Sequence, residues 1–129
     1  MSTPIHQEIV FPASPKRVYD ALLDACQFSQ FSGGASAEID RAAGGSFSCF
    51  GGMVSGRNIE LKSDQRIVQA WRAGNWPEGV YSLVRFELVE EGAGTKLTFD
   101  QSGFPEGQRE HLDGGWSKMY WEPLRKYLS

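Results

Sequence analysis

The stretch that decides the fold is the end of the chain, residues 108–129, which reads QREHLDGGWSKMYWEPLRKYLS. Its large apolar side chains recur at spacings of three and four residues; they are Leu112, Trp116, Met119, Tyr120, Leu124, Tyr127 and Leu128. That spacing is typical of an amphipathic helix whose apolar stripe faces a core. A helix with so much aromatic surface needs a large apolar partner, which the rest of the chain must supply.

Three features of this predicted helix are unusual. Gly114 and Gly115 lie near its start, although glycine costs roughly 1 kcal/mol relative to alanine inside a helix. We expect them to let the helix pass close to a sheet. Pro123 removes one backbone hydrogen bond, so a bend is expected there. His111 is interpreted as a surface residue of the polar face, and the alternative is a general base at a cavity mouth.

Upstream of the helix, the chain has the pattern of short strands joined by tight turns. Alternation of apolar and polar residues is clearest in residues 82–90 and 95–101, which form a predicted hairpin. Shorter runs of strand character precede them at residues 5–11, 37–41, 46–50, 53–61 and 66–72. Gly56 lies inside one of these runs and indicates a bulge or close packing. The short connections favour antiparallel pairing, because parallel crossovers need more chain.

Two short helices are expected after the first strand. Ser14 and Pro15 suit the cap and the first residue of a helix that runs to about residue 24. A second helical turn is expected at residues 27–31. The whole order of elements predicts an α+β protein of one domain, residues 1–129. Its curved antiparallel β-sheet would wrap around the long C-terminal helix, because an open sheet of this size must curl or expose its edges.

Composition excludes several classes of function. The formal net charge of −3 and the isoelectric point near 5.4 argue against a nucleic-acid partner. No apolar run is long enough for a membrane span and no secretory signal is visible, so a cytoplasmic protein is expected. Cys26 and Cys49 are expected to be reduced thiols, buried or half-buried. Because the histidines and cysteines lack metal-site spacing and no phosphate-loop motif occurs, we expect no metal and no cofactor.

Six aromatic residues are the candidate ligand-binding residues, because they come from strands, a loop and the helix that should face one another: Phe50, Trp71, Trp76, Phe86, Trp116 and Tyr120. Rings around a void between sheet and helix would form a pocket for a hydrophobic or aromatic small molecule. The alternative is that the same rings only fill the core. Trp76, in a loop beside Pro77, is the candidate lid. No catalytic residue is assigned.

Charged residues on the predicted strands are the other candidates: Arg57, Arg72, Arg85, Glu60, Glu87 and Asp100. An inward pair of opposite charge would indicate a functional site, because an unpaired buried charge is very costly. The favoured interpretation is that these side chains face solvent and pair across neighbouring strands.

The sequence resembles the activator of heat-shock-protein-90 ATPase homologue family (AHSA), within the START/Bet-v-1-like superfamily of helix-grip proteins. The segments that carry the resemblance are FPASPKRVYDALLD (11–24), AGGSFSCFGGMVSGRNIELKSDQRIVQAWR (43–72), NWPEGVYSLVRFELVEEGAGTKLTFDQSGFP (75–105) and HLDGGWSKMYWEPLRKYL (111–128). The glycine-rich turn, the IVQAWR strand and the GW at the start of the last helix are specific in combination.

The resemblance implies three functions. The first is binding of a hydrophobic small molecule in the cavity between sheet and C-terminal helix. The second is a cyclase- or dehydratase-like activity that uses polar residues inside that cavity. The third is a co-chaperone-type interaction module of the stress response, with a chaperone as its partner. Self-association as a homodimer through an edge strand stays open.

Overall fold

The computed structural model of this chain describes residues 3–129, which contain one antiparallel sheet of seven strands. The strands are β1 (Ile5–Phe11), β2 (Glu38–Ile39), β3 (Ser46–Cys49), β4 (Val54–Lys62), β5 (Arg66–Ala73), β6 (Ser82–Glu91) and β7 (Gly94–Ser102). Their spatial order is β1-β7-β6-β5-β4-β3-β2. All strands except β1 pair with their sequence neighbours, and β1 pairs with β7, the last strand of the chain. The predicted antiparallel arrangement is therefore confirmed.

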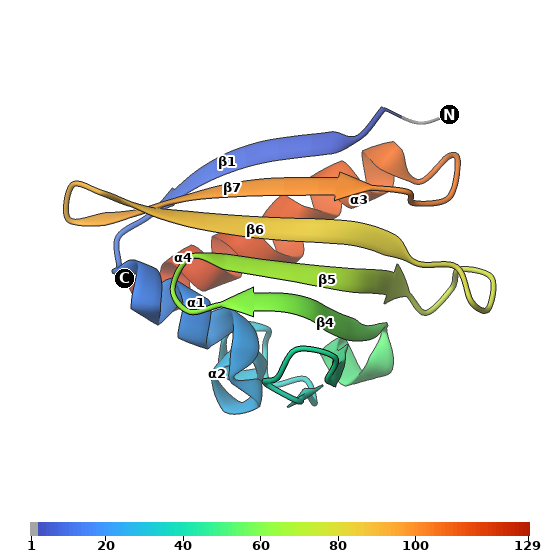
Figure 1. Cartoon of the computed structure of the whole chain (residues 1–129), viewed down its shortest axis with the longest axis horizontal. Helices are drawn as coiled ribbons and strands as arrows, with labels where there is room; N and C mark the ends of the chain where they lie inside the picture. The colour runs from blue at the N-terminus through green and yellow to red at the C-terminus, as the bar shows by residue number, and fades with distance from the viewer. Residues whose placement is uncertain (1–2) are drawn as a thin grey trace.

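The helices lie after the first strand and at the end of the chain. They are α1 (Pro15–Leu23), α2 (Ala25–Phe31), the short turn η1 (Phe50–Gly52), α3 (Arg109–Trp116), η2 (Ser117–Trp121) and α4 (Glu122–Leu128). The last three form one continuous C-terminal helix, which runs diagonally behind the curved sheet from α3 to α4 (Figure 1). This is the helix-grip architecture predicted from the sequence.

The first two helices follow from their caps. The hydroxyl of Ser14 accepts a hydrogen bond from the N–H of Arg17 and so caps α1. Asp24 ends α1 and also caps α2, because its carboxylate accepts from the N–H of Cys26 at 2.9 Å. As a result the second helix begins at Ala25, two residues before the predicted start.

The C-terminal helix changes its hydrogen-bond pattern in the middle. In η2 the bonding is π-helical, and the N–H of Glu122 donates to the carbonyl of Ser117, five residues back. The wider turn places Trp121 in the core beside Tyr120, while Met119 is 43% exposed. The predicted stripe omitted Trp121, because it assumed a constant helical period, and its member Met119 lies at the exposed edge of the buried side chains. Pro123 lies in the first turn of α4, and the irregularity precedes it.

Two predictions about glycines have opposite outcomes. A Cβ atom at Gly56 would lie 1.8 Å from the carbonyl oxygen of Ala70, so close packing is confirmed there, and the register shift lies further along, at residue 59. At Gly114 and Gly115 an added Cβ would meet no atom within 4 Å. The prediction that this pair allows a close approach to the sheet is therefore wrong.

The exception in the first strand has a structural reason. Ile5, Ile9 and Phe11 are buried, and Gln7 lies on the same face. The side-chain carbonyl of Gln7 accepts a hydrogen bond from the indole N–H of Trp121 at 2.6 Å. Its amide donates to the carboxylate of Asp113 at 2.8 Å. Gln7 therefore ties β1 to the C-terminal helix.

The two cysteines differ in environment. Both are free thiols, and Cys49 is buried as predicted. Burial raises the pKa of Cys49 to about 12, which makes its thiol unreactive near neutral pH. Cys26 is exposed on α2, so the prediction of a buried or half-buried thiol is wrong there. It lies on the outer surface of a short helix, where the apolar spacing gave no information.

Candidate ligand-binding cavity

A cavity of about 570 Å³ lies between the C-terminal helix and one end of the sheet. The turn η1 and the start of β4 form one side of it, through Phe50, Gly52, Met53 and Val54. The end of β5 and the following loop form a second side, through Trp71, Ala73, Gly74 and Asn75. The helix closes the third side with His111, Leu112, Gly115, Trp116, Met119 and Tyr120.

Four of the six predicted ligand-binding residues line this cavity, namely Phe50, Trp71, Trp116 and Tyr120. Trp76 does not line it and is not a lid. It is 5% exposed and packs edge-on behind Trp71, with ring centroids 5.6 Å apart. Phe86 is fully inside the core, against Phe99 at 5.3 Å. Strand alternation placed Phe86 on the inward side, and Trp76 was a candidate because of its loop position, but only packing decides which rings border a void.

The aromatic residues of the cavity form a continuous wall. The Trp116 ring lies 4.3 Å from that of Tyr120 and 5.1 Å from that of Trp71, between centroids. The Phe50 ring meets Tyr120 edge-on at 5.4 Å. Such tilted and edge-on pairs are favourable beyond the area they bury. The wall therefore holds its shape without a ligand.

A buried chain of hydrogen bonds fixes the orientation of Trp116. Its indole N–H donates to the side-chain carbonyl of Gln101 at 2.8 Å. The Gln101 amide donates to the Ser82 hydroxyl at 3.0 Å, which in turn donates to the backbone carbonyl of Trp71 at 2.8 Å. The sequence analysis did not single out Gln101. The signal was its spacing of two residues from Phe99 and four from Leu97, which places a polar side chain on the same face of β7 as these two apolar ones.

The polar groups at the cavity are few. The hydroxyl of Tyr120 accepts a hydrogen bond from the indole N–H of Trp71 at 3.4 Å. Burial raises the pKa of Tyr120, so its hydroxyl stays protonated. Asn75 and His111 are exposed at the mouth. None of the described residues that line the cavity is Asp, Glu, Lys or Arg, so the site is suited to an uncharged ligand.

Two methionines lie at the mouth of the cavity, beside Asn75 and His111. Met53 is 67% exposed on the sheet side, and Met119 is 43% exposed on the helix side. Methionine side chains are unbranched and adapt to irregular partners.

Within residues 3–129, no group of three or more His, Cys, Asp and Glu residues could hold a metal ion.

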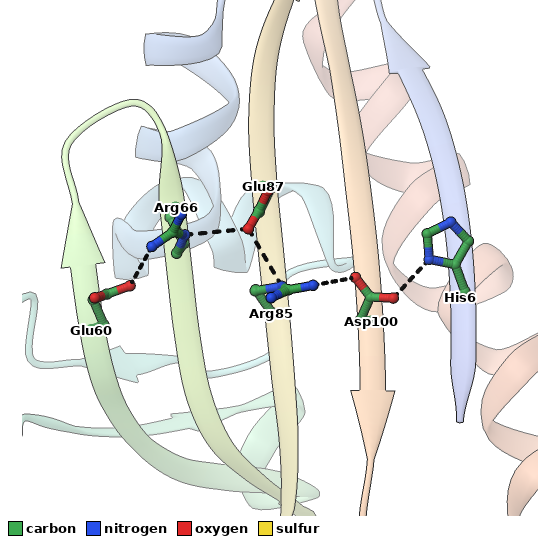
Figure 2. A network of polar contacts seen from close by, with 6 residues as sticks. All are labelled: His6, Glu60, Arg66, Arg85, Glu87 and Asp100. Carbon is green, nitrogen blue, oxygen red and sulfur yellow. Dashed lines mark hydrogen bonds and ion pairs between the residues drawn. The ribbon is translucent and has the colours of Figure 1, made fainter. Parts of the chain in front are cut away.

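The opposite face of the sheet carries a row of charges across β1, β7, β6, β5 and β4 (Figure 2). The Asp100 carboxylate lies 2.7 Å from His6 Nδ1 and 3.1 Å from Arg85 Nη2. The Glu87 carboxylate lies 3.5 Å from Arg85 Nε and 3.3 Å from Arg66 Nε. Arg66 also reaches Glu60 at 3.2 Å. Pairing across strands is thus confirmed for Glu60, Arg85, Glu87 and Asp100.

The two remaining candidate charges bind backbone carbonyls. Arg72 donates to the carbonyl of Trp76 at 2.7 Å, which holds the loop between β5 and β6. Arg57 donates to the carbonyl of Gly44 at 3.0 Å. None of the six lines the cavity.

The chain belongs to the family described as Activator of Hsp90 ATPase homolog 1-like protein, which it matches over residues 12–129. It is similar to the mouse (Mus musculus) protein named activator of 90 kDa heat shock protein ATPase homolog 2. The two are 28% identical over 124 residues, 96% of this chain and 37% of the mouse protein. The human homolog 1 is 28% identical over 116 residues, 90% of this chain and 34% of its own length. The chain spans little more than a third of these relatives.

Solved structures agree with the fold. An HSP90 activator from Plasmodium falciparum has a TM-score of 0.93 and 26% identity, covering 98% of this chain and 96% of that one. The Aha1 dimer from Colwellia psychrerythraea has a TM-score of 0.83 at 20% identity, covers 98% of this chain and 96% of that one, and shows the fold alone.

No helix in residues 3–129 is long and apolar enough to cross a membrane.

Proposed function

We propose that this protein binds an uncharged, apolar or aromatic small molecule in the cavity between sheet and C-terminal helix. The observation that carries the proposal is a cavity of about 570 Å³ walled by Phe50, Trp71, Trp116 and Tyr120. Pockets for drug-sized ligands have volumes of roughly 300–1,000 Å³ and are mostly apolar with a few placed polar groups.

The energetics favour a flat apolar ligand. Each square ångström of apolar surface that leaves water contributes about 25 cal/mol. The aromatic wall is fixed by ring contacts and by the Trp116–Gln101 hydrogen bond, so binding needs little ordering of the protein. His111 and Asn75 at the mouth could orient one polar group of the ligand. A charged head group would find no counter-charge in the lining.

The test is a screen of uncharged lipids and aromatic compounds by native mass spectrometry and thermal shift. Binding should raise the melting temperature and change the emission of Trp71 and Trp116, which both line the cavity. The test variant is Trp71→Ala, which removes part of the wall and should weaken binding. If no uncharged compound binds, and emission stays unchanged, the proposal is wrong.

The second candidate is a chaperone interaction, and it rests on the relatives. The mouse and human proteins are named as activators of a 90 kDa heat shock protein ATPase, and the Plasmodium structure as an HSP90 activator. By analogy, this chain would bind such a chaperone in the cytoplasm and raise its ATPase rate. An ATPase assay with purified chaperone tests this, and an unchanged rate at saturating protein counts against it.

The remaining alternatives have less support. A cyclase or dehydratase needs an acid and a base near the substrate, and the ionisable groups that line the cavity are His111 at the mouth and Tyr120, whose hydroxyl burial keeps protonated. Homodimer formation is proposed by analogy with the Colwellia protein, which is described as a dimer. Light scattering across a range of concentrations distinguishes a dimer from a monomer.

A further inference from the structure

Gly115 occupies a special place on the C-terminal helix. Counting by four along the helix, Leu112, Trp116 and Tyr120 form a buried row at the back of the cavity. His111, Gly115 and Met119 form a parallel row at its mouth. Gly115 is the middle residue of this second row, and it leaves a gap between the side chains of His111 and Met119.

The fold itself does not require glycine at this position. Glycine is needed where φ is positive or where another chain segment approaches too closely for a side chain. Gly115 lies inside α3, outside the positive-φ set, and an added Cβ would meet no atom within 4 Å. Alanine there would stabilise the helix, because it loses less backbone freedom than glycine on folding. The chain therefore forgoes helix stability at a position whose one visible consequence is open space in the cavity.

We propose that Gly115 determines the size of the ligand, because its missing side chain is the opening through which the ligand enters and rests against the helix backbone. This inference rests on the proposed small-molecule function. The ligand would lie across the helix between His111 and Met119, with its flat face toward Trp116. A side chain at residue 115 would occupy the same space as the outer part of the ligand.

Gly114 provides a matched control within the same helix. It has the same chemistry, the same helical turn and no atom within 4 Å of an added Cβ. It is exposed and does not line the cavity. Substitutions at the two positions should raise helix stability equally, but only those at Gly115 reduce the space for a ligand.

The experiment compares the wild type with Gly115→Leu and Gly114→Leu. The probes are phenylnaphthylamine, a long uncharged aromatic compound, and naphthalene, a shorter one, each titrated by fluorescence. Gly115→Leu should weaken phenylnaphthylamine binding by about tenfold, because the leucine side chain would occupy the space of the outer part of this ligand. Naphthalene should lose less affinity. Gly114→Leu should bind both probes as the wild type does, and both variants should melt at or above the wild-type temperature.

Three results would overturn the inference. If Gly115→Leu binds phenylnaphthylamine as tightly as the wild type, the residue does not limit ligand size. If Gly114→Leu loses as much affinity as Gly115→Leu, the effect comes from the helix and not from the cavity. If the wild type binds neither probe, the space beside Gly115 does not take a flat aromatic ligand and the inference is wrong, whereas the small-molecule function is decided by the wider screen. The first two results leave that function standing.

Discussion

The two faces of one sheet show how differently the same strands are used. On β7, Leu97, Phe99 and Gln101 point toward the C-terminal helix and are buried, while Lys96 and Asp100 point to the other side. The first face carries the rings and the cavity, and the second carries the ion-pair row of Figure 2. Period-two alternation therefore separates a dry face from a charged one within a single strand.

The comparison teaches where the free energy of the fold resides. A large buried ring contributes several kcal/mol, because its removal loses apolar burial and leaves a cavity. An exposed ion pair contributes about 0–1 kcal/mol, because water and salt screen it. The helix face should therefore control both stability and ligand binding, whereas the charged face should affect them little.

The largest effect is expected from Trp116→Ala. The change removes contacts with Phe99 and Tyr120 and leaves Gln101 without its indole donor. We expect a loss of about 3–5 kcal/mol in the free energy of unfolding, measured by urea denaturation. Met119→Ala is the control, since that side chain is 43% exposed, and it should cost less than about 1 kcal/mol. Equal losses in the two variants would contradict the assignment of the core.

A smaller loss in the free energy of unfolding is expected from Gln101→Leu. Leucine has a volume similar to that of glutamine, but it cannot make the two hydrogen bonds of the Gln101 side chain. The indole N–H of Trp116 and the hydroxyl of Ser82 would both lose a buried partner. That should cost about 1–3 kcal/mol. Gln65→Leu, at an exposed turn, is the control. A stability equal to that of the control would show that the hydrogen-bond chain is energetically neutral.

On the charged face, Glu87→Gln should have a minor effect. Glu87 lies between Arg66 and Arg85, and all three side chains are more than a third exposed. The expected loss is below about 1 kcal/mol, and it should shrink further at high salt. Chemical denaturation at low and high ionic strength measures both effects. A loss as large as that of Gln101→Leu would reverse the ranking of the two faces.

The smallest effect concerns the titration of His6. Hydrogen bonds to Asp100 and then to Glu8 raise the pKa of His6 above its ordinary value of 6.5. The stability from this contact is complete below pH 6.5 and is lost as the pH rises through the raised pKa. An NMR titration should give a midpoint above 6.5, and Asp100→Asn should lower it. A midpoint at or below 6.5 in the wild type would show that the contact does not persist in solution.

Asp100 gives the opposite sign on the same face. Burial alone would raise its pKa, but hydrogen bonds from His6 and Arg85 lower it overall below 3.8. Its contribution is therefore present above pH 3.8 and lost as the pH falls through the lowered value. The contact between His6 and Asp100 should therefore contribute fully to stability only between about pH 4 and pH 6.5.

The sequence predicted much of this architecture because alternation and helical spacing are local signals. Strands such as residues 82–90 and 95–101 were found close to their observed bounds in β6 and β7. The π-helical segment was not predictable from spacing, so Trp121 was missed. Of the six aromatic candidates, Trp76 and Phe86 proved to be packed away from the cavity.

The sequence by itself determined the order of elements, the family, and which face of each strand is apolar, because these depend on neighbouring residues along the chain. The tertiary structure decided which rings border empty space, why Gln7 and Gln101 lie on an apolar face, and what Gly115 leaves open. The reason is physical. A cavity is the volume that side chains from distant segments fail to fill, and no local pattern records it.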